Sequence, residues 1–237
     1  IVRAARQAYD HAPRDDAFAA AENDTLARLA SLQDDETVEV GDGARRFLAP
    51  ATLDALAALY EDHPDATLTA GSTDVGLWVT KQLKRPQTVI YAGRVIELQK
   101  IEEKGGALEI GAGVTYSDAR ALIARHYPDM GVVIRRLGSV QIRNTGTIGG
   151  NIANGSPIGD SMPVLLALGG SVLLRREHDE REVRIEDFYT GYRKNVMQPG
   201  EFIRAVRVPR LRPGARFAVY KLSKRFDQDI SAVCAAF

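Results

Sequence analysis

The stretch Gly146–Pro163, GTIGGNIANGSPIGDSMP, holds five glycines and two asparagines but few side chains large enough to build a hydrophobic core. Glycine loses more conformational entropy on ordering than any other residue, so a glycine-rich ordered stretch indicates a particular backbone requirement. We therefore expect the backbone here to turn through positive φ or to come very close to another group.

A second glycine turn, Ala70–Gly76 (AGSTDVG), directly follows the predicted strand TLTA at residues 67–70. Neither stretch contains Lys or Arg, and both contain small hydroxyl residues: Ser72, Thr73, Thr147 and Ser156. Each is expected to present a run of free backbone N–H groups, which can hold a phosphate by dipoles rather than by full charges. The alternative is that both are only tight turns.

Other kinds of site are disfavoured by the sequence. Neither stretch fits the strand, G-x-G-x-x-G, helix pattern, and the chain has no G-x-x-x-x-G-K-[ST] motif, so Rossmann and P-loop folds are not expected. The four histidines lack metal-ligand spacing, and Cys234 lies in an apolar strand, so no metal site is predicted. Leu77 and Trp78 are expected to pack a helix rather than face a ligand.

The composition is that of an ordinary globular protein of 237 residues. Thirty-one basic residues balance 31 acidic ones, so neither nucleic acid nor an anionic membrane surface is an expected partner. No apolar run approaches the roughly 20 residues that cross a bilayer. The lone Cys234 cannot form an internal disulfide, and a cytoplasmic location is therefore expected.

Periodicity along the chain predicts an α+β class. Residues 1–40 are interpreted as a helix end followed by a solvated linker, and residues 52–60 as a helix. Thr115, three residues before Asp118, is expected to cap a helix, and the EHDE segment is expected to lie between two strands. We expect two subdomains with a cleft between them. The final strand, 227–237, is expected to lack its pairing partner, so the C-terminal part is predicted to be incomplete.

Four segments in order and spacing carry a resemblance to a known family: TLTAGSTDVG, GTIGGNIANGSPIGD, GYRKNVMQPGEFIRAVRVP and YKLSKRFDQDIS. Residues 47–237 resemble the FAD-binding domain of xanthine dehydrogenase and related molybdenum hydroxylases, in particular the small iron–sulfur and flavin subunit of the bacterial enzymes. The resemblance implies a two-subdomain PCMH-type (vanillyl-alcohol-oxidase-like) fold with FAD in the cleft. Residues 1–40 would then be the end of an iron–sulfur domain helix plus a linker, and 41–237 the FAD-binding domain.

The resemblance also implies which residues hold the FAD, without a covalent link. Both glycine stretches would wrap its diphosphate, Asp160 would contact the adenosine end, and Asp74 would be the acidic, catalytic residue beside the reactive face. Phe202 and Ile203 would line the flavin ring, with Lys221 near its polar edge. The full implied set is Leu68, Thr69, Ala70, Gly71, Ser72, Thr73, Asp74, Leu137, Gly146, Thr147, Gly150, Asn151, Asn154, Ser156, Asp160, Phe202, Ile203 and Lys221.

The function implied by the resemblance is electron transfer. FAD would receive electrons from 2Fe-2S clusters and reduce NAD while a molybdenum cofactor elsewhere oxidises hypoxanthine or xanthine to urate. The partners would be a molybdenum-cofactor subunit and an upstream iron–sulfur domain, in a hetero-oligomer. Two alternatives stay open: the flavin subunit of a carbon monoxide, nicotine or aldehyde hydroxylase, and a non-catalytic scaffold that has lost flavin. The substrate, and NAD against oxygen as acceptor, also stay open.

Overall fold

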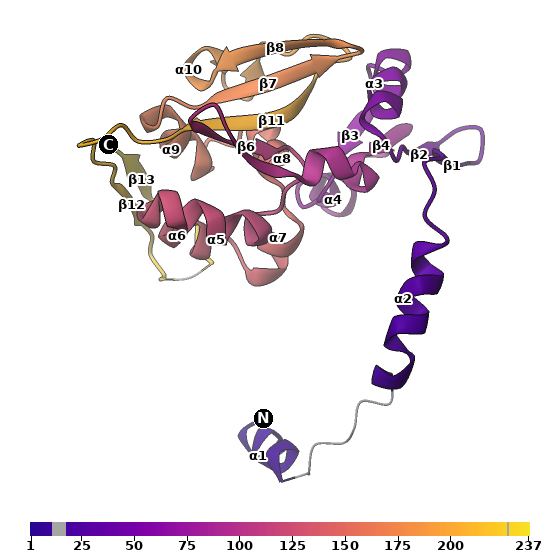
Figure 1. Ribbon diagram of the computed structural model, residues 1–237, viewed down its shortest axis with the longest axis horizontal. Helices are drawn as coiled ribbons and strands as arrows, with labels where there is room; N and C mark the ends of the chain where they lie inside the picture. The colour runs from indigo at the N-terminus through magenta and orange to yellow at the C-terminus, as the bar shows by residue number, and fades with distance from the viewer. Residues whose placement is uncertain (11–17, 227) are drawn as a thin grey trace. The chain divides into compact units, whose positions relative to one another are not determined.

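The computed structural model describes residues 1–10, 18–226 and 228–237, which form two units, Ile1–Asp35 and Glu36–Phe237 (Figure 1). The first unit holds α1 (Val2–Tyr9), a 3₁₀ turn η1 (Ala19–Ala21) and α2 (Glu22–Ala30), and none of their side chains is buried. The helical spacing predicted at its start is confirmed, whereas part of the predicted linker, 11–17, lies outside the described residues. No helix in the described part of the chain has both the length and the apolar character to span a bilayer.

The second unit begins with a small lobe, residues 36–100, which we call the N-terminal lobe. Its sheet has the order β1-β2-β4-β3, with β1 antiparallel to β2 and the other pairs parallel. Thr52 begins the helix α3, since its Oγ1 accepts the N–H of Ala55 at 3.2 Å. The elements are β1 (Val38–Gly41), β2 (Arg46–Ala49), α3 (Leu53–Asp62), β3 (Thr67–Thr69), α4 (Val75–Thr80), β4 (Thr88–Tyr91), η2 (Ala92–Arg94) and η3 (Ile96–Gln99).

Residues 101–237 form the C-terminal lobe, built on an antiparallel sheet of order β5-β6-β11-β7-β8. The helices α5–α9 lie together on one side of this sheet (Figure 1). The predicted cap at Thr115 and the hairpin around EHDE are both confirmed. The elements are β5 (Ile101–Lys104), β6 (Ala107–Gly111), α5 (Tyr116–His126), α6 (Pro128–Arg135), α7 (Val140–Thr145), α8 (Ile148–Asn154), α9 (Ser161–Ala167), β7 (Ser171–Arg176), β8 (Asp179–Arg184), α10 (Ile185–Phe188), β9 (Tyr189–Gly191), β10 (Lys194–Asn195) and β11 (Phe202–Pro209).

The last strand of the chain has a pairing partner. Strand β13 (Val233–Ala236) pairs antiparallel with β12 (Val219–Leu222), so that Lys221 faces Cys234. The expectation that this strand is unpaired is therefore wrong. Periodicity identifies a strand but not its neighbour, and β12 forms this separate two-stranded sheet instead of joining the large one.

Each lobe has its own hydrophobic core. Leu56, Ile90 and Leu98 centre the N-terminal core, and Ile110, Ile152 and many others fill the C-terminal one. Phe202 is an exception, because it belongs to the C-terminal lobe's β11 but packs in the N-terminal core. The start of β11 therefore links the two hydrophobic cores.

Candidate functional site

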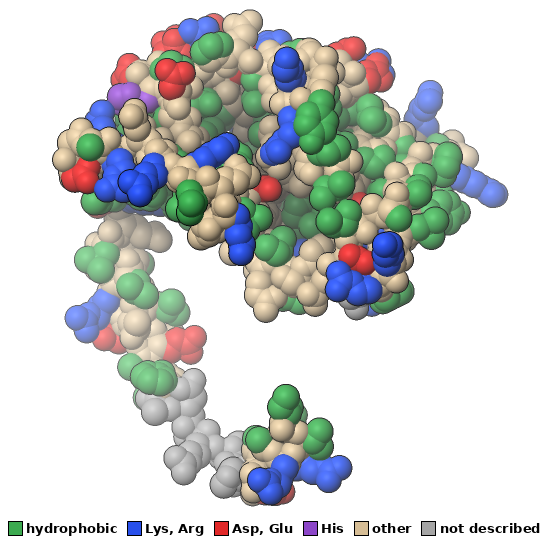
Figure 2. Space-filling view, turned by 180° about the vertical axis from the view of Figure 1, so that it is seen from behind, with side chains coloured by type: hydrophobic (Ala, Val, Ile, Leu, Met, Phe, Trp, Pro, Cys, Tyr) green, Lys and Arg blue, Asp and Glu red, His purple; other side chains and the backbone are tan. Residues whose placement is uncertain are grey.

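A cavity of about 500 Å³ lies between the two lobes. The N-terminal lobe contributes α3, the end of β3 and the first glycine turn, and the C-terminal lobe contributes the second glycine stretch and the start of β11. Ligand sites in proteins commonly enclose roughly 300–1,000 Å³ and combine apolar walls with a few polar groups. Acidic and basic side chains are interspersed over the molecular face shown in Figure 2, which agrees with the balanced charge of the chain.

The first glycine turn is shaped to receive an anion. Ser72 has a φ of +56°, in the left-handed region, and its Oγ lies 2.8 Å from Oγ1 of Thr69. The backbone N–H groups of Ser72, Thr73 and Asp74 make no hydrogen bond within the described part of the chain. Successive N–H groups in such a turn form a concave anion-binding nest. The geometry thus agrees with the dipole-based phosphate site predicted for this turn.

The second glycine stretch differs from its prediction. It forms the helix α8, which Thr147 caps by accepting the N–H of Gly150 at 3.1 Å and which Gly155 ends with a φ of +56°. The N–H groups of Ile148 and Gly149 donate to the carbonyl oxygens of Val114 and Ala112, each at 3.0 Å. The expected run of free N–H groups is therefore absent at these positions, because the segment after β6 already binds them.

Close approach between backbones explains two of the glycines. A Cβ on Gly149 would overlap Ala112, and a Cβ on Gly71 would overlap the carbonyl group of Thr145. A Cβ on Gly150 would meet only Oγ1 of Thr147, at 2.8 Å. Gly71 and Gly149 are thus required by close contact with other parts of the chain, whereas Gly150 borders the cavity and leaves room for a ligand.

The cavity gathers most of the residues that the sequence implied for cofactor binding. Those that line it are Leu68, Thr69, Ala70, Gly71, Ser72, Thr73, Asp74, Leu137, Gly146, Thr147, Gly150, Asn151, Asn154, Phe202 and Ile203. Ser156, Asp160 and Lys221 lie outside its lining. On the cavity wall, Oδ1 of Asn151 is buried and has no hydrogen-bond partner in the described part of the chain. Because a buried unpaired acceptor is costly, it favours a bound ligand that donates a hydrogen bond.

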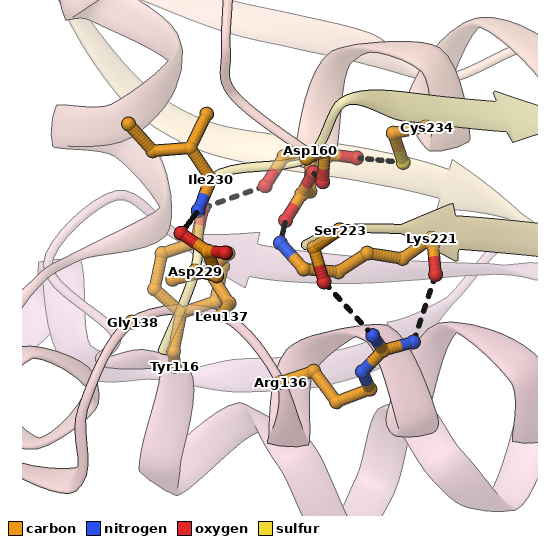
Figure 3. A network of polar contacts seen from close by, with 12 residues as sticks. Tyr116, Arg136, Leu137, Gly138, Asp160, Lys221, Ser223, Asp229, Ile230 and Cys234 are labelled. Atoms are coloured by element: carbon orange, nitrogen blue, oxygen red, sulfur yellow. Dashed lines mark hydrogen bonds and ion pairs between the residues drawn. The ribbon is translucent and has the colours of Figure 1, made fainter. Parts of the chain in front are cut away.

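Asp160 and Lys221 form a buried ion pair (Figure 3). Lys221 Nζ donates to Asp160 Oδ2 at 2.6 Å, and Ser231 Oγ donates to Oδ1 at 2.5 Å. The Cys234 thiol lies 3.8 Å from the Asp160 carbonyl oxygen. In the structure these residues connect the β12–β13 hairpin to the start of α9, rather than lining the cavity as expected.

Sequence reasoning missed several lining residues, among them Tyr60, Trp78, Tyr116, Met197 and Glu201. Trp78 was expected to pack a helix, but it borders the cavity with Lys84 Nζ 5.0 Å from its ring centre. Burial raises the pKa of Tyr116, whose hydroxyl pairs with Ser161 at 2.6 Å. Helical spacing could have placed Leu56 and Tyr60 on one face of α3, but it does not reveal what that face meets.

Glu201 is a buried acid at the cavity wall. Arg181 donates to both of its carboxylate oxygens, at 2.6 and 2.7 Å, and thereby lowers the pKa of Glu201. By contrast, Asp74 is exposed and its side chain makes no helix-cap hydrogen bond. Among the described residues, no three His, Cys, Asp or Glu side chains gather as possible metal ligands. The polar groups of the cavity thus fit an organic ligand with an anionic centre, held against apolar walls.

Comparison with known proteins gives a consistent identification. Residues 41–211 match the family described as the FAD binding domain in molybdopterin dehydrogenase. The xanthine dehydrogenase of Emericella nidulans is 31% identical over 208 residues, which cover 83% of this chain but only 15% of that protein. The nicotinate dehydrogenase FAD-subunit of Eubacterium barkeri is 31% identical over 195 residues, covering 79% of this chain and 66% of that subunit.

Solved structures show the same fold. The crystal structure of a Cu,Mo-CO dehydrogenase superposes with a TM-score of 0.75 at 28% identity, covering 80% of this chain and 67% of that one. Quinoline 2-oxidoreductase of Pseudomonas putida 86 superposes with a TM-score of 0.73 at 26% identity, and the match covers 79% of this chain and 66% of that one. The resemblance seen in the sequence is confirmed, and FAD is the cofactor that the cavity fits. This chain therefore belongs to the family of FAD-binding domains of molybdopterin dehydrogenases.

Proposed function

We propose that this chain is the FAD-binding electron-transfer module of a xanthine dehydrogenase, which accepts electrons from 2Fe-2S clusters and reduces NAD during oxidation of hypoxanthine or xanthine to urate. The observation that carries the proposal is the single cavity where fifteen implied FAD residues meet. Xanthine dehydrogenases among the relatives support the choice of enzyme. Because iron–sulfur clusters need several cysteine ligands and this chain has one, the clusters and the molybdenum cofactor lie in other parts of the complex.

Different residues of the chain bind different parts of FAD in this proposal. The N–H groups of Ser72, Thr73 and Asp74 would donate hydrogen bonds to the diphosphate oxygens. Asn151 Oδ1 would accept a hydrogen bond from the ligand. Phe202 supplies a flat apolar wall. The two lobes with a cleft between them are consistent with a PCMH-type fold.

FAD is bound without a covalent link in this proposal. Among the described residues that line the cavity there is neither His nor Cys, the usual attachment points, and Cys234 lies outside the lining. Of the two acids in the lining, Glu201 pairs with Arg181, whereas Asp74 has no ion pair within the described part of the chain, and we assign Asp74 the role of the acidic residue beside the reactive face. When bound, FAD supplies the two-electron chemistry, and the protein supplies binding, orientation and electrostatics.

A second candidate is the flavin subunit of another molybdenum hydroxylase, either of the carbon monoxide, nicotine or aldehyde type expected above or of a nicotinate dehydrogenase. The structural match to a CO dehydrogenase and the identity with a nicotinate dehydrogenase FAD-subunit favour it. Both candidates share the FAD site and differ in substrate, which would bind outside this chain. A scaffold without flavin is the remaining alternative, and the unpaired N–H groups of the first turn argue against it.

Two measurements test the proposal. The purified chain is first mixed with FAD, and flavin absorbance that co-elutes with the protein is expected. Its complex with the molybdenum and iron–sulfur partners is then assayed with xanthine, carbon monoxide and nicotinate as electron donors and NAD or oxygen as acceptor. If xanthine reduces NAD through the complex and carbon monoxide and nicotinate do not, the first candidate is supported. Absence of bound flavin would contradict both enzymatic candidates.

A further inference from the structure

Two of the contacts between the lobes, besides the packing of Phe202, differ in kind. At one place Gly71 lies against the backbone of Thr145, where no side chain intervenes. At the other, the N-terminal lobe's α3 lies against β7 of the C-terminal lobe and is held by charged side chains. Arg175 Nη2 donates to Asp54 Oδ1, and Arg176 donates to both carboxylate oxygens of Glu61, at 2.5 and 2.7 Å.

The ion pairs flank the part of α3 that forms the cavity wall. Leu56 and Tyr60 lie between Asp54 and Glu61 in the sequence, and both border the cavity. Tyr60 also packs edge-on against Phe202, with ring centres 6.4 Å apart. Any movement of α3 away from β7 would therefore displace this wall from the start of β11.

The two pairs differ in their exposure, but both reach solvent. The Arg175 side chain is 11% exposed while Asp54 is 76% exposed, and the values for Arg176 and Glu61 are 43% and 28%. Arg176 lowers the pKa of Glu61, so this pair stays charged at neutral pH. Salt screens attraction between exposed charges, whereas it leaves the Gly71–Thr145 contact unaffected.

We propose that Arg175 and Arg176 are positioning residues for the cavity: through Asp54 and Glu61 they hold α3 against β7 and thereby slow the escape of bound FAD. The inference rests on the proposed function. Opening of the cavity along α3 requires both pairs to separate, and added salt weakens them. Dissociation of FAD is therefore expected to accelerate as ionic strength rises.

The test measures the rate of FAD release, followed by the rise in flavin fluorescence after dilution, in the full chain at low and high salt. The double variant D54N/E61Q keeps side-chain size and removes both carboxylate charges. Release about three- to tenfold faster than in the wild type at low salt is expected, with little further change at high salt. The matched control E186Q breaks the exposed Arg184–Glu186 pair, 2.8 Å long, within the C-terminal lobe and is expected to release FAD at the wild-type rate.

Charge exchange separates this role from a merely structural one. R176E places two acids together and is expected to release FAD fast, whereas E61R/R176E restores an opposite pair and slow, salt-sensitive release. Wild-type release from D54N/E61Q, or failure of the exchange to restore slow release, would overturn the proposal. If the wild type binds no FAD, the proposed function fails. Amide hydrogen exchange in α3 of the ligand-free chain then tests the role of the ion pairs by itself. The amides of α3 must exchange faster in D54N/E61Q than in the wild type, and equal rates would show that the ion pairs do not hold α3 against β7.

Discussion

Gly71 and Thr145 come so close that the structure leaves no room between them for a single methyl group, and this contact joins the first glycine turn to the end of α7. The residues belong to different lobes and both stretches border the cavity. The contact therefore sets how the two walls of the FAD site stand to each other, independently of any charge.

Gly71→Ala is expected to lower both stability and flavin content. The added methyl group must displace the Thr145 backbone, which costs roughly 1–3 kcal/mol for overpacking and shifts the cavity walls. Denaturant unfolding and the ratio of bound flavin to protein measure the two effects. Gly76→Ala is the control, because nothing lies within 4 Å of its added Cβ and Gly76 is in α4. It should bind FAD normally, and equal behaviour of the two variants would contradict the assigned contact.

Ser72 is expected to tolerate glycine better than alanine. Its φ of +56° is strained for a residue with a Cβ, so Ser72→Gly relieves roughly 1 kcal/mol that Ser72→Ala retains. Both variants lose the hydroxyl contact with Thr69, and their difference in unfolding free energy thus reports the backbone strain. FAD affinity should stay near wild type in both, since the N–H groups remain. An alanine variant as stable as the glycine variant would show that the turn is unstrained.

The buried pair of Lys221 and Asp160 is expected to be costly to break from one side. Both side chains are less than 5% exposed, so Lys221→Met leaves an unpaired buried carboxylate and should destabilise the protein by roughly 3–5 kcal/mol. The double variant K221M/D160N removes both charges and should be more stable than K221M. Thermal and denaturant unfolding of K221M, of the single variant D160N and of the double variant provide the comparison. Additive losses would mean that the two groups are not coupled.

Cys234 is expected to react slowly with thiol reagents. Burial, reinforced by the negative charge of Asp160, raises the pKa of the thiol from 9.0 to about 11. That difference of about two units leaves roughly a hundredfold less thiolate at pH 8, and the thiolate is the reactive form. The labelling rate of the native chain should rise as pH increases towards 11. A native rate equal to that of the urea-unfolded chain would contradict the environment assigned to this side chain.

Asp229 is expected to stay ionised in acid. Hydrogen bonds from the Arg225 side chain, at 3.0 Å, and then from its backbone N–H lower the pKa of Asp229 from 3.8 to about 2. Because the folded-state pKa is depressed, the stabilisation is fully present above pH 3.8 and is lost as pH falls through about 2. An NMR titration of the carboxyl carbon measures this directly. A midpoint near 3.8 in the folded chain would show that Arg225 does not hold the carboxylate.

Local features of this protein could be predicted from the sequence because their partners lie within a few residues. Thr52 and Thr115 each bind an N–H three positions later, and the β7–β8 hairpin closes over a short turn. The glycine stretches likewise marked the cavity, since their small residues and missing charges form a pattern that a linear reading can find. The family resemblance then supplied fifteen of the 31 residues that line the cavity.

The tertiary structure alone decided which polar groups of the site are free and which are already used. Ile148 donates to Val114, and Lys221 binds Asp160, a residue 61 positions away. Such pairs depend on how remote strands and helices pack, and an N–H or a charge has the same appearance in the sequence whether it is paired or not. For this reason the sequence indicated which segments border the cavity, and only the fold determined that the N–H groups of Ile148 and Gly149 are already bonded while those of Ser72, Thr73 and Asp74 have no partner within the described part of the chain.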